Sequence, residues 1–168
     1  SGSCLLVAVS GGQDSMALLQ LLKDLKRIHR WTLEIWHGDH GWHKDSTHIS
    51  KELHQWCESN NLNLHIDQTT KQVTNSEEKA RDWRYSMLAQ RACKLSTKNA
   101  QTSSIQVVTA HTGSDRAETF LINLARGADL SGLVSLRESR IIQDDLHLIR
   151  PMLIFNRKET ATICRDFK

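Results

Sequence analysis

The sequence predicts an α/β protein with a doubly wound, mostly parallel sheet and helices on both faces, a Rossmann-like architecture. Three observations predict this class: short strand-like segments recur along the chain, helix-like segments separate them, and the first strand-like segment is apolar at every position. Such a strand is expected to be buried on both faces, as in parallel sheets covered by helices. Ligands of these sheets bind beyond the carboxyl ends of the strands, where the strand order reverses.

Each strand is expected from the pattern of its apolar residues. The first is a continuous apolar run, and the second and third alternate apolar with polar side chains. The polar segment 98–104, which is expected to be a loop, precedes the fourth. The expected strands cover residues 5–9, 31–37, 62–66 and 105–110.

Helical periodicity separates these strands. Leucines three and four residues apart predict the first helix, Asp45 or Ser46 is expected to cap the second, and Ser76 followed by Glu77 and Glu78 predicts the start of the third. The first helix is expected over residues 16–28, and the second has a buried stripe of Ile49, Leu53, Trp56 and Cys57. The third is expected over residues 76–95, with a stripe of Ala80, Trp83, Met87, Leu88 and Ala92. The fourth ends at Gly127 and has a stripe of Ala117, Phe120, Leu121 and Leu124.

The last part of the chain follows a different pattern. Two short apolar segments flank an Asp-Asp pair and predict a hairpin over residues 141–149, and a last helix is expected over 157–167. We expect a single domain over residues 1–168. Its core covers about 1–135, and residues 136–168 form the hairpin and the start of a following helical part.

Composition places the chain among ordinary globular proteins. It has 168 residues, of which 39% are hydrophobic and 24% are charged, and this excludes collagen-like, strongly acidic and disordered classes. Its apolar runs fall far short of the roughly 20 residues of a membrane helix, and we expect no secretory leader. The net charge of +3 permits a nucleic-acid partner without requiring one. We expect reduced cytoplasmic thiols, with no zinc site or disulfide, because the cysteines are scattered: Cys4, Cys57, Cys93 and Cys164.

A glycine-containing segment joins the first strand to its helix. Two adjacent glycines let a ligand approach the backbone, and the free N–H groups at a helix start favour an anion. Asp14 suits an anion site if Mg²⁺ bridges its carboxylate to phosphates, and Asp14 is therefore the expected metal ligand. The alternative is a structural turn in which Asp14 or Ser15 caps the helix. The expected nucleotide-binding loop consists of Ser10, Gly11, Gly12, Gln13, Asp14 and Ser15.

This loop resembles the PP-loop of the N-type ATP pyrophosphatases, which implies an adenine nucleotide alpha hydrolase-like fold. Members of that family cleave ATP between the α and β phosphates, transfer AMP and release pyrophosphate. Within it, segments spread over residues 5–159 resemble the tRNA(Ile)-lysidine synthetases in order and spacing, most closely the cyanobacterial and plastid members. These segments are residues 38–42, 78–85, 110–119, 126–133, 150–153 and 157–159.

The resemblance implies a reaction, its cofactors and its partners. ATP would adenylate the 2-oxo group of the wobble cytidine of an isoleucine tRNA, and the side-chain amine of L-lysine would then displace AMP to give lysidine. ATP and Mg²⁺ are the expected cofactors, and the bacterial cytoplasm or the plastid stroma is the expected location. A homodimer is left open, and we expect the C-terminal tRNA-binding regions of the family to be absent.

Three basic side chains are candidates for phosphate chemistry. Arg81 and Arg84 lie three residues apart on one helix face and suit the triphosphate or the charge that develops on the α-phosphate. The alternative is a surface ion pair of Arg81 with Glu77. His111 ends the fourth strand, which is expected beside the first, on the same edge as Ser10. It would hydrogen-bond a phosphate or the adenylated intermediate, unless it is a core histidine.

Two carboxylates are candidates for holding the lysine. Asp115 and Glu118 lie three residues apart on the fourth helix and face away from its expected apolar stripe. Lysine arrives as an ammonium with a pKa near 10.4, which must be held and must lose a proton before it attacks. The alternative is a solvated helix face. The common bacterial pattern has a second histidine and paired acidic residues at 112–114, where this chain has Thr-Gly-Ser.

Further candidates follow the second strand. Asp39 and His40 are expected to line the nucleotide pocket near adenine through backbone groups. Histidines at 37, 40 and 43 have metal-like spacing, but solvated histidines are favoured because no acidic or cysteine cluster completes a site. Two other functions remain open: another PP-loop adenylating enzyme acting on RNA or a small molecule, and a non-catalytic nucleotide-binding module. Thiolating members usually need paired cysteines, which this sequence lacks.

Overall fold

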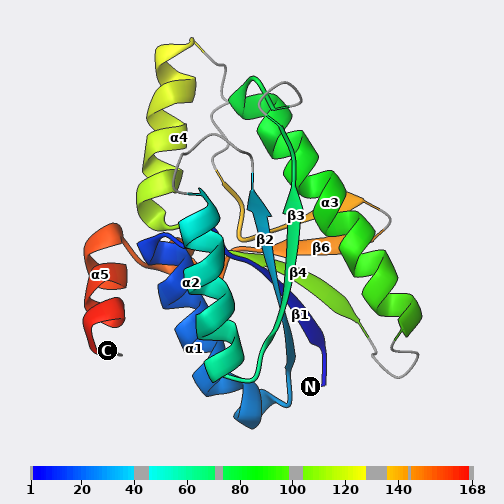
Figure 1. The fold of residues 1–168 in the computed structure, drawn as a ribbon. Coiled ribbons are helices and arrows are strands. Elements are labelled where there is room, and N and C mark those ends of the chain that lie inside the picture. The colour runs from blue at the N-terminus through cyan, green and yellow to red at the C-terminus, as the bar shows by residue number, and fades with distance from the viewer. Residues whose placement is uncertain are drawn as a thin grey trace.

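Six strands form one sheet in the order β3-β2-β1-β4-β6-β5 in the computed structural model (Figure 1). The structure describes residues 2–39, 46–70, 74–98, 104–127, 136–143 and 145–166. All paired strands are parallel except β5, which is antiparallel to β6. The predicted doubly wound, mostly parallel sheet is therefore confirmed. The strands are β1 (Cys4–Ala8), β2 (Thr32–Asp39), β3 (Asn63–Gln68), β4 (Ile105–Thr109), β5 (Ser139–Gln143) and β6 (Leu146–Ile149).

Helices follow the strands in the expected order. The expected cap at Ser76 is confirmed, because its Oγ accepts a hydrogen bond of 3.3 Å from the backbone N–H of Lys79. The expectations for Asp45, for residues 99–103 and for residue 167 lie outside the described residues. The helices are α1 (Gln13–His29), α2 (Ser46–Ser59), α3 (Glu77–Lys98), α4 (Gly113–Ala125), the 3-10 helix η1 (Pro151–Ile154) and α5 (Arg157–Asp166).

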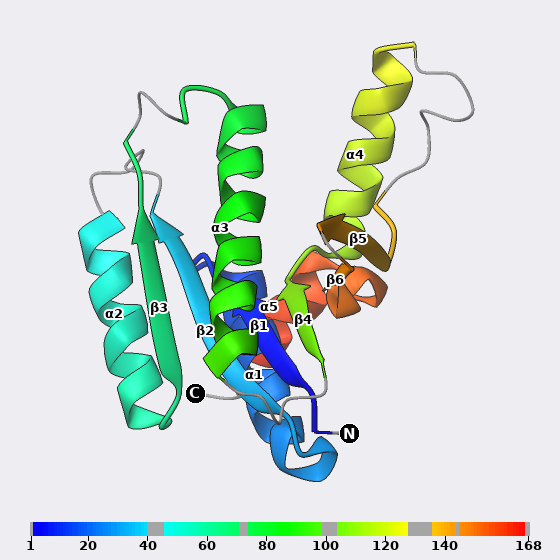
Figure 2. The same ribbon diagram turned by 90° about the vertical axis from the view of Figure 1, so that its right-hand side faces the viewer.

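The central strand β1 supplies side chains to the cores on both faces of the sheet. Leu5 and Val7 are buried in a cluster with residues of α1 and α2, against which α5 also packs. Leu6, between them in sequence, is buried on the other face with residues of α3. Figure 2 shows α3 in front of the sheet and α1 and α5 behind it. The continuous apolar pattern of this strand therefore reflects burial on both faces.

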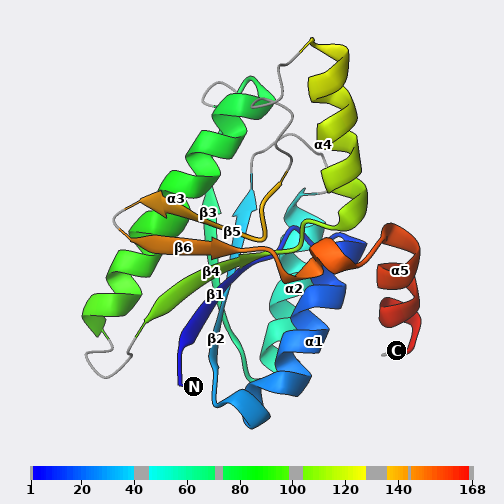
Figure 3. The same ribbon diagram turned by 180° about the vertical axis from the view of Figure 1, so that it is seen from behind.

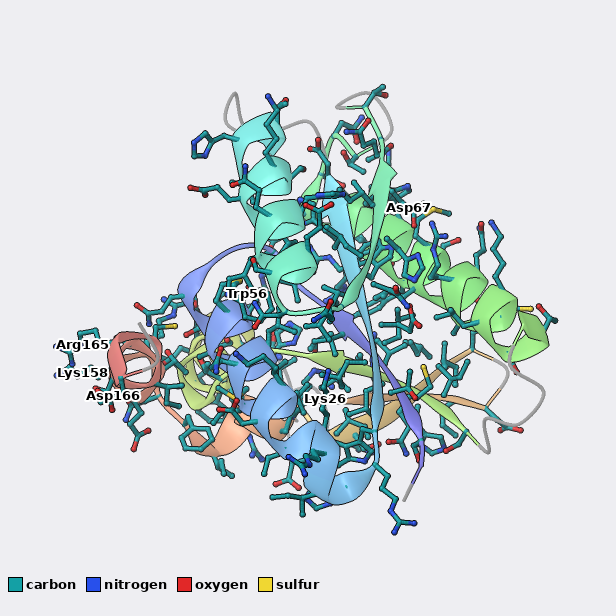
Figure 4. The ribbon with its side chains drawn as sticks, turned by 60° about the horizontal axis from the view of Figure 1, so that its bottom comes forward. Lys26, Trp56, Asp67, Lys158, Arg165 and Asp166 are labelled. Carbon is teal, nitrogen blue, oxygen red and sulfur yellow. The ribbon has the colours of Figure 1, made fainter. Side chains whose placement is uncertain are left out.

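A half-buried polar contact links α3 to the sheet. Asp67 of β3, labelled in Figure 4, accepts hydrogen bonds of 2.7 Å from Trp36 Nε1 and 2.7 Å from the Arg91 guanidinium. Burial alone would raise the pKa of Asp67, but these two donors outweigh it and lower the pKa. The carboxylate therefore stays charged and joins Trp36 of β2 to Arg91 of α3.

The expected core stripe of α4 is wrong. Phe120 is 40% exposed, Leu121 61% and Leu124 51%, and no residue of this helix is buried. Figure 2 shows why: α4 rises beyond the carboxyl edge of the sheet and does not lie along it. Its first turn is anchored to the C-terminal part of the chain, where the Gly113 N–H donates a 2.7 Å hydrogen bond to the Phe155 carbonyl. An amphipathic pattern shows that a helix has an apolar side but does not show what covers that side.

The cysteines are free thiols, as expected. Cys4 and Cys57 are buried, and burial raises the pKa of both thiols to about 11, with Glu34 contributing at Cys4. Cys93 is exposed and Cys164 is half-buried, so the expectation of core positions holds for two of the four. Within the described ranges, no helix combines the length and the apolar character needed to cross a membrane.

Candidate functional site

A cleft of about 590 Å³ opens at the carboxyl edge of the sheet. β1 lies between β2 and β4 in the sheet. The chain continues from β1 to β2 and β3 on one side and then crosses to β4 on the other side, so the strand order reverses at β1. Segments from three strand ends and from α3 and α4 converge there. The lining residues that the argument uses are residues 10–15, Trp36, His37, Asp39, Ile49, Arg84, Thr109, His111 and Asp115.

The turn that follows β1 has a shape that glycine alone permits at one position. Gly11 has φ +83°, and a Cβ there would lie 2.5 Å from the Cγ2 atom of Ile49. Two hydroxyls hold the turn: Ser15 Oγ donates to the Gly12 carbonyl at 2.8 Å, and Ser10 Oγ accepts from the Gly12 N–H at 3.3 Å. The turn is therefore preformed and presents its backbone to the cleft.

The first turn of α1 follows this segment directly. The first N–H groups of any helix lack partners inside the helix and carry the positive end of its dipole. Gly12 is the N-cap in an extended conformation, and no side chain caps the helix. The alternative that Asp14 or Ser15 caps the helix is therefore wrong. These N–H groups are suited to bind an anion such as a phosphate.

Helix α5 contacts the turn from the other end of the chain. Gln13 Nε2 donates to the Arg157 carbonyl at 2.8 Å and to Thr160 Oγ1 at 3.0 Å. Thr160 is buried, and its hydroxyl donates to Asp14 Oδ1. Sequence reasoning missed Thr160, because no pattern links residues that lie 146 positions apart.

Asp14 is the carboxylate at this turn, and it suits Mg²⁺ shared with phosphates. Mg²⁺ in nucleotide sites commonly takes one or two protein carboxylates and completes its shell with phosphates and water. The described residues contain no group of three or more His, Cys, Asp or Glu side chains that could hold a metal ion alone. The single carboxylate of Asp14 fits a metal ion that is also held by phosphates.

His111 lies two residues after the end of β4, and its Nδ1 is 2.9 Å from Thr109 Oγ1. Burial lowers the pKa of His111 to about 4; the cations of Arg150 and Arg84 add to this, and Asp115 opposes it. The imidazole is therefore neutral near pH 7. A neutral imidazole offers one donor and one acceptor to a ligand in the cleft.

The two arginines of α3 differ in position. Arg84 lines the cleft, and burial lowers its pKa, with Arg81 adding to the effect while Tyr85 and Glu77 oppose it. Arg81 is exposed and is not among the residues that line the cleft. The structure thus brings only Arg84 of this pair to the nucleotide loop.

The two carboxylates of α4 share one cation. Arg157 lies 3.0 Å from Asp115 Oδ1 and 3.7 Å from Glu118 Oε2. Asp115 also accepts a 2.7 Å hydrogen bond from the Thr112 N–H, which caps the helix. Burial alone would raise the pKa of Asp115, but the donors at Thr112 and Arg157 lower it. Asp115 lines the cleft, whereas Glu118 is exposed and does not.

The end of β2 contributes one residue that was expected in the site and two that were not. Asp39 lines the cleft as predicted, while His40 and His43 lie outside the described residues. His37 is buried, and its Nδ1 is 2.8 Å from the Val9 carbonyl, so it positions the strand that leads into the turn. Trp36 and His37 also line the cleft. A strand residue near the carboxyl end can belong to the core and to a cleft, and sequence alone does not separate the two.

Comparisons with known proteins agree with this geometry. A family model described as a PP-loop domain matches residues 1–168. A tRNA(Ile)-lysidine synthase of Prochlorococcus marinus (strain NATL1A) is 52% identical over 167 residues, covering 99% of this chain and 51% of that protein. A chloroplastic tRNA(Ile)-lysidine synthase of Pyropia yezoensis is 41% identical over 165 residues, covering 98% of this chain and 48% of that protein. The chain spans about half the length of these curated relatives.

A solved structure shares the fold. A U34-tRNA thiolase from Methanococcus maripaludis superposes with a TM-score of 0.70 at 16% sequence identity, covering 99% of this chain and 58% of that chain. At this level of identity the similarity concerns the arrangement of strands and helices.

Proposed function

The chain belongs to the PP-loop domain family, and on that premise we propose that it catalyses the ATP-dependent attachment of L-lysine to the wobble cytidine of an isoleucine tRNA. The names of its relatives support this assignment, because tRNA(Ile)-lysidine synthases from cyanobacteria and from a plastid match nearly the whole chain. The same sources support the bacterial cytoplasm or the plastid stroma as its location. The observation that carries the proposal is that the nucleotide loop, Arg84, His111 and Asp115 line one cleft.

ATP would bind with its phosphates on the turn after β1. The N–H groups of residues 11–15 and the hydroxyl of Ser10 would supply donors, the Ser15 hydroxyl would hold the turn in shape, and the helix dipole favours the negative charge. Asp14 would hold Mg²⁺, which neutralises phosphate charge when it is bound. The adenosine would lie toward Asp39 at the end of β2, where backbone groups border the cleft.

The first step would transfer the adenylyl group to the RNA base. The O2 atom of the cytosine attacks the α-phosphorus, the bond from that phosphorus to the bridging oxygen breaks, and pyrophosphate leaves. Negative charge grows on the α-phosphate oxygens and on the leaving group, and a guanidinium in the cleft stabilises both. Arg84 suits this task, and the neutral His111 suits a hydrogen bond to the adenylated base.

The second step would place lysine on the activated base. The side-chain nitrogen of lysine attacks C2 of the cytosine, the bond from C2 to the O2 atom breaks, and AMP leaves with that oxygen. The ammonium must first lose a proton, because only the free amine carries the attacking electron pair. Asp115 and Glu118 suit an ammonium, and Arg157 now occupies the space between them.

Mass analysis of the tRNA tests the proposal. The 168-residue chain is incubated with Mg²⁺, ATP, lysine and an isoleucine tRNA transcript, and the wobble nucleoside is weighed. A gain of lysine minus water at the wobble cytidine, with one pyrophosphate released per modified tRNA, is the expected result. A transcript with guanosine at the wobble position is the control and gains nothing. Release of free phosphate in place of pyrophosphate, or an unmodified cytidine, would contradict the proposal.

A further inference from the structure

A second cavity of about 310 Å³ lies between α3 and the edge strand β5. Figure 3 shows α3 crossing behind β5 and β6. Residues of two elements line it: Asp82, Tyr85 and Ser86 from α3, and Arg140, Ile141, Ile142 and Gln143 from β5. We call it the α3–β5 groove. It adjoins the nucleotide cleft, because Arg84 lines the cleft and the next residue, Tyr85, lines the groove.

Arginines gather between these two cavities. The Arg140 guanidinium stacks over the Tyr85 ring at 4.5 Å from its centroid. Arg150 is buried beside Tyr85; its guanidinium donates to the Arg137 carbonyl at 2.8 Å, and its Nε has no hydrogen-bond partner among the described residues. Burial lowers the pKa of Arg150; Tyr85 opposes this, and Arg140 and Arg81 lower the pKa further. The guanidinium groups therefore lie close enough to repel one another.

This excess of positive charge is suited to a polyanion. Arg84 lines the cleft and Arg140 lines the groove, and the charge of Arg81 acts on both Arg84 and Arg150. The carboxylates nearby are Asp82, which lines the groove, and Glu77, which acts on Arg84. Adjacent cations are stabilised when phosphates lie between them, and guanidinium groups bind phosphate oxygens through paired donors.

The surface beside these charges is suited to unstacked bases. The Tyr85–Arg140 pair forms a stacked aromatic and guanidinium surface, and Ile141 next to it is 58% exposed. Proteins that bind single-stranded RNA combine basic grooves with stacking surfaces of this kind. A target base in the cleft must be unstacked, so the nucleotides beside it also leave the regular stack.

We propose that the α3–β5 groove binds the single-stranded nucleotides that flank the target base, with Arg140 on a phosphate and a flanking base against Tyr85 and Ile141. The inference rests on the proposed function for the identity of the RNA. It adds a path for that RNA from the cleft across α3 to the edge of the sheet.

A charge-matched pair of variants tests the groove. Arg140→Gln removes the exposed guanidinium in the groove, whereas Arg27→Gln removes an exposed one in the last turn of α1 that lines neither cavity. The full chain is titrated, with Mg²⁺ and ATP present, into a fluorescent anticodon stem-loop RNA with a wobble cytidine. We expect Arg140→Gln to weaken binding about tenfold at low salt and to reduce the salt slope by about 1. Arg27→Gln and the ATP affinity of both variants should match the unaltered chain.

Cross-linking supplies an independent readout. A 4-thiouridine beside the wobble cytidine should cross-link, under ultraviolet light, to the peptides that carry Tyr85 or residues 139–143. Three results would contradict RNA binding in the groove: equal RNA affinities of the two variants, cross-links elsewhere, or no RNA binding by the unaltered chain. If the tRNA gains lysine while Arg140→Gln binds RNA normally, the proposal for the groove is wrong and the proposed function stands. If Arg140→Gln loses RNA binding but no lysidine forms, the proposed function alone fails.

Discussion

Thr160 is expected to control metal-dependent nucleotide turnover through its contact with Asp14. Its buried hydroxyl donates to Asp14 Oδ1 and accepts from Gln13 Nε2 at 3.0 Å. Thr160→Val keeps the shape of the side chain and removes these hydrogen bonds. Gln13 keeps its other acceptor, the Arg157 carbonyl at 2.8 Å, so the main loss falls on the carboxylate.

The magnitude follows from the character of this hydrogen bond. A hydrogen bond to a charged group contributes about 1.5–3 kcal/mol. Asp14 is half-buried at the edge of an open cleft, so water replaces part of the lost contact and the low end of that range applies. A loss of about 1.4 kcal/mol corresponds to roughly a tenfold fall in kcat/KM. Thr160→Val should also need more Mg²⁺ for half-maximal turnover, because the carboxylate is no longer held in one orientation.

A neighbouring threonine provides the matched control. Thr162 lies on the same helix, is exposed, and donates to the Lys158 carbonyl at 3.2 Å. Thr162→Val makes the same chemical change without touching the nucleotide loop. Pyrophosphate release is measured for both variants across a Mg²⁺ titration, with urea unfolding as a measure of stability. If Thr160→Val and Thr162→Val have the same turnover and the same Mg²⁺ requirement, Thr160 does not position Asp14.

Three further variants follow from the site. Asp14→Asn should abolish pyrophosphate release while the circular dichroism spectrum and Tm stay unchanged; normal release would refute the role of Asp14. The pKa of His111 falls from 6.5 to about 4 on folding, so the unfolded chain binds more protons between these values. Stability in urea should therefore fall as the pH falls through this window, and His111→Asn should flatten the dependence; an unchanged slope would contradict it. Arg157→Gln should lower the KM for lysine severalfold, because Arg157 competes for Asp115 and Glu118; a higher KM would show that Arg157 helps to bind lysine.

The location of the cleft could be predicted from the sequence because it depends on strand order. Short apolar segments separated by helical ones predict a doubly wound sheet, and such a sheet gathers the residues that follow its central strands. Strand order therefore predicts that the loop of residues 10–15, Asp39 and His111 lie together at the carboxyl edge of the sheet, and the structure places them in the cleft there. Local patterns were sufficient because Asp39 ends a strand, and His111 and the loop of residues 10–15 come within a few residues after one.

Contacts between distant parts of the chain could not be predicted in the same way. Thr160 reaches Asp14 across 146 residues, and no periodicity encodes that distance. The burial of Arg150 depends on how β6 and α3 pack, and single arginines are usually exposed. The apolar stripe of α4 was assigned to the core because amphipathic helices usually pack on the sheet, but this helix extends beyond it.

A crystal structure with Mg²⁺ and a non-hydrolysable ATP analogue tests the central claim most directly. The account predicts phosphates against the N–H groups of residues 11–15, a metal ion on Asp14, and Arg84 turned toward the α-phosphate. A triphosphate bound elsewhere on the chain, or an empty cleft at saturating analogue, would contradict it.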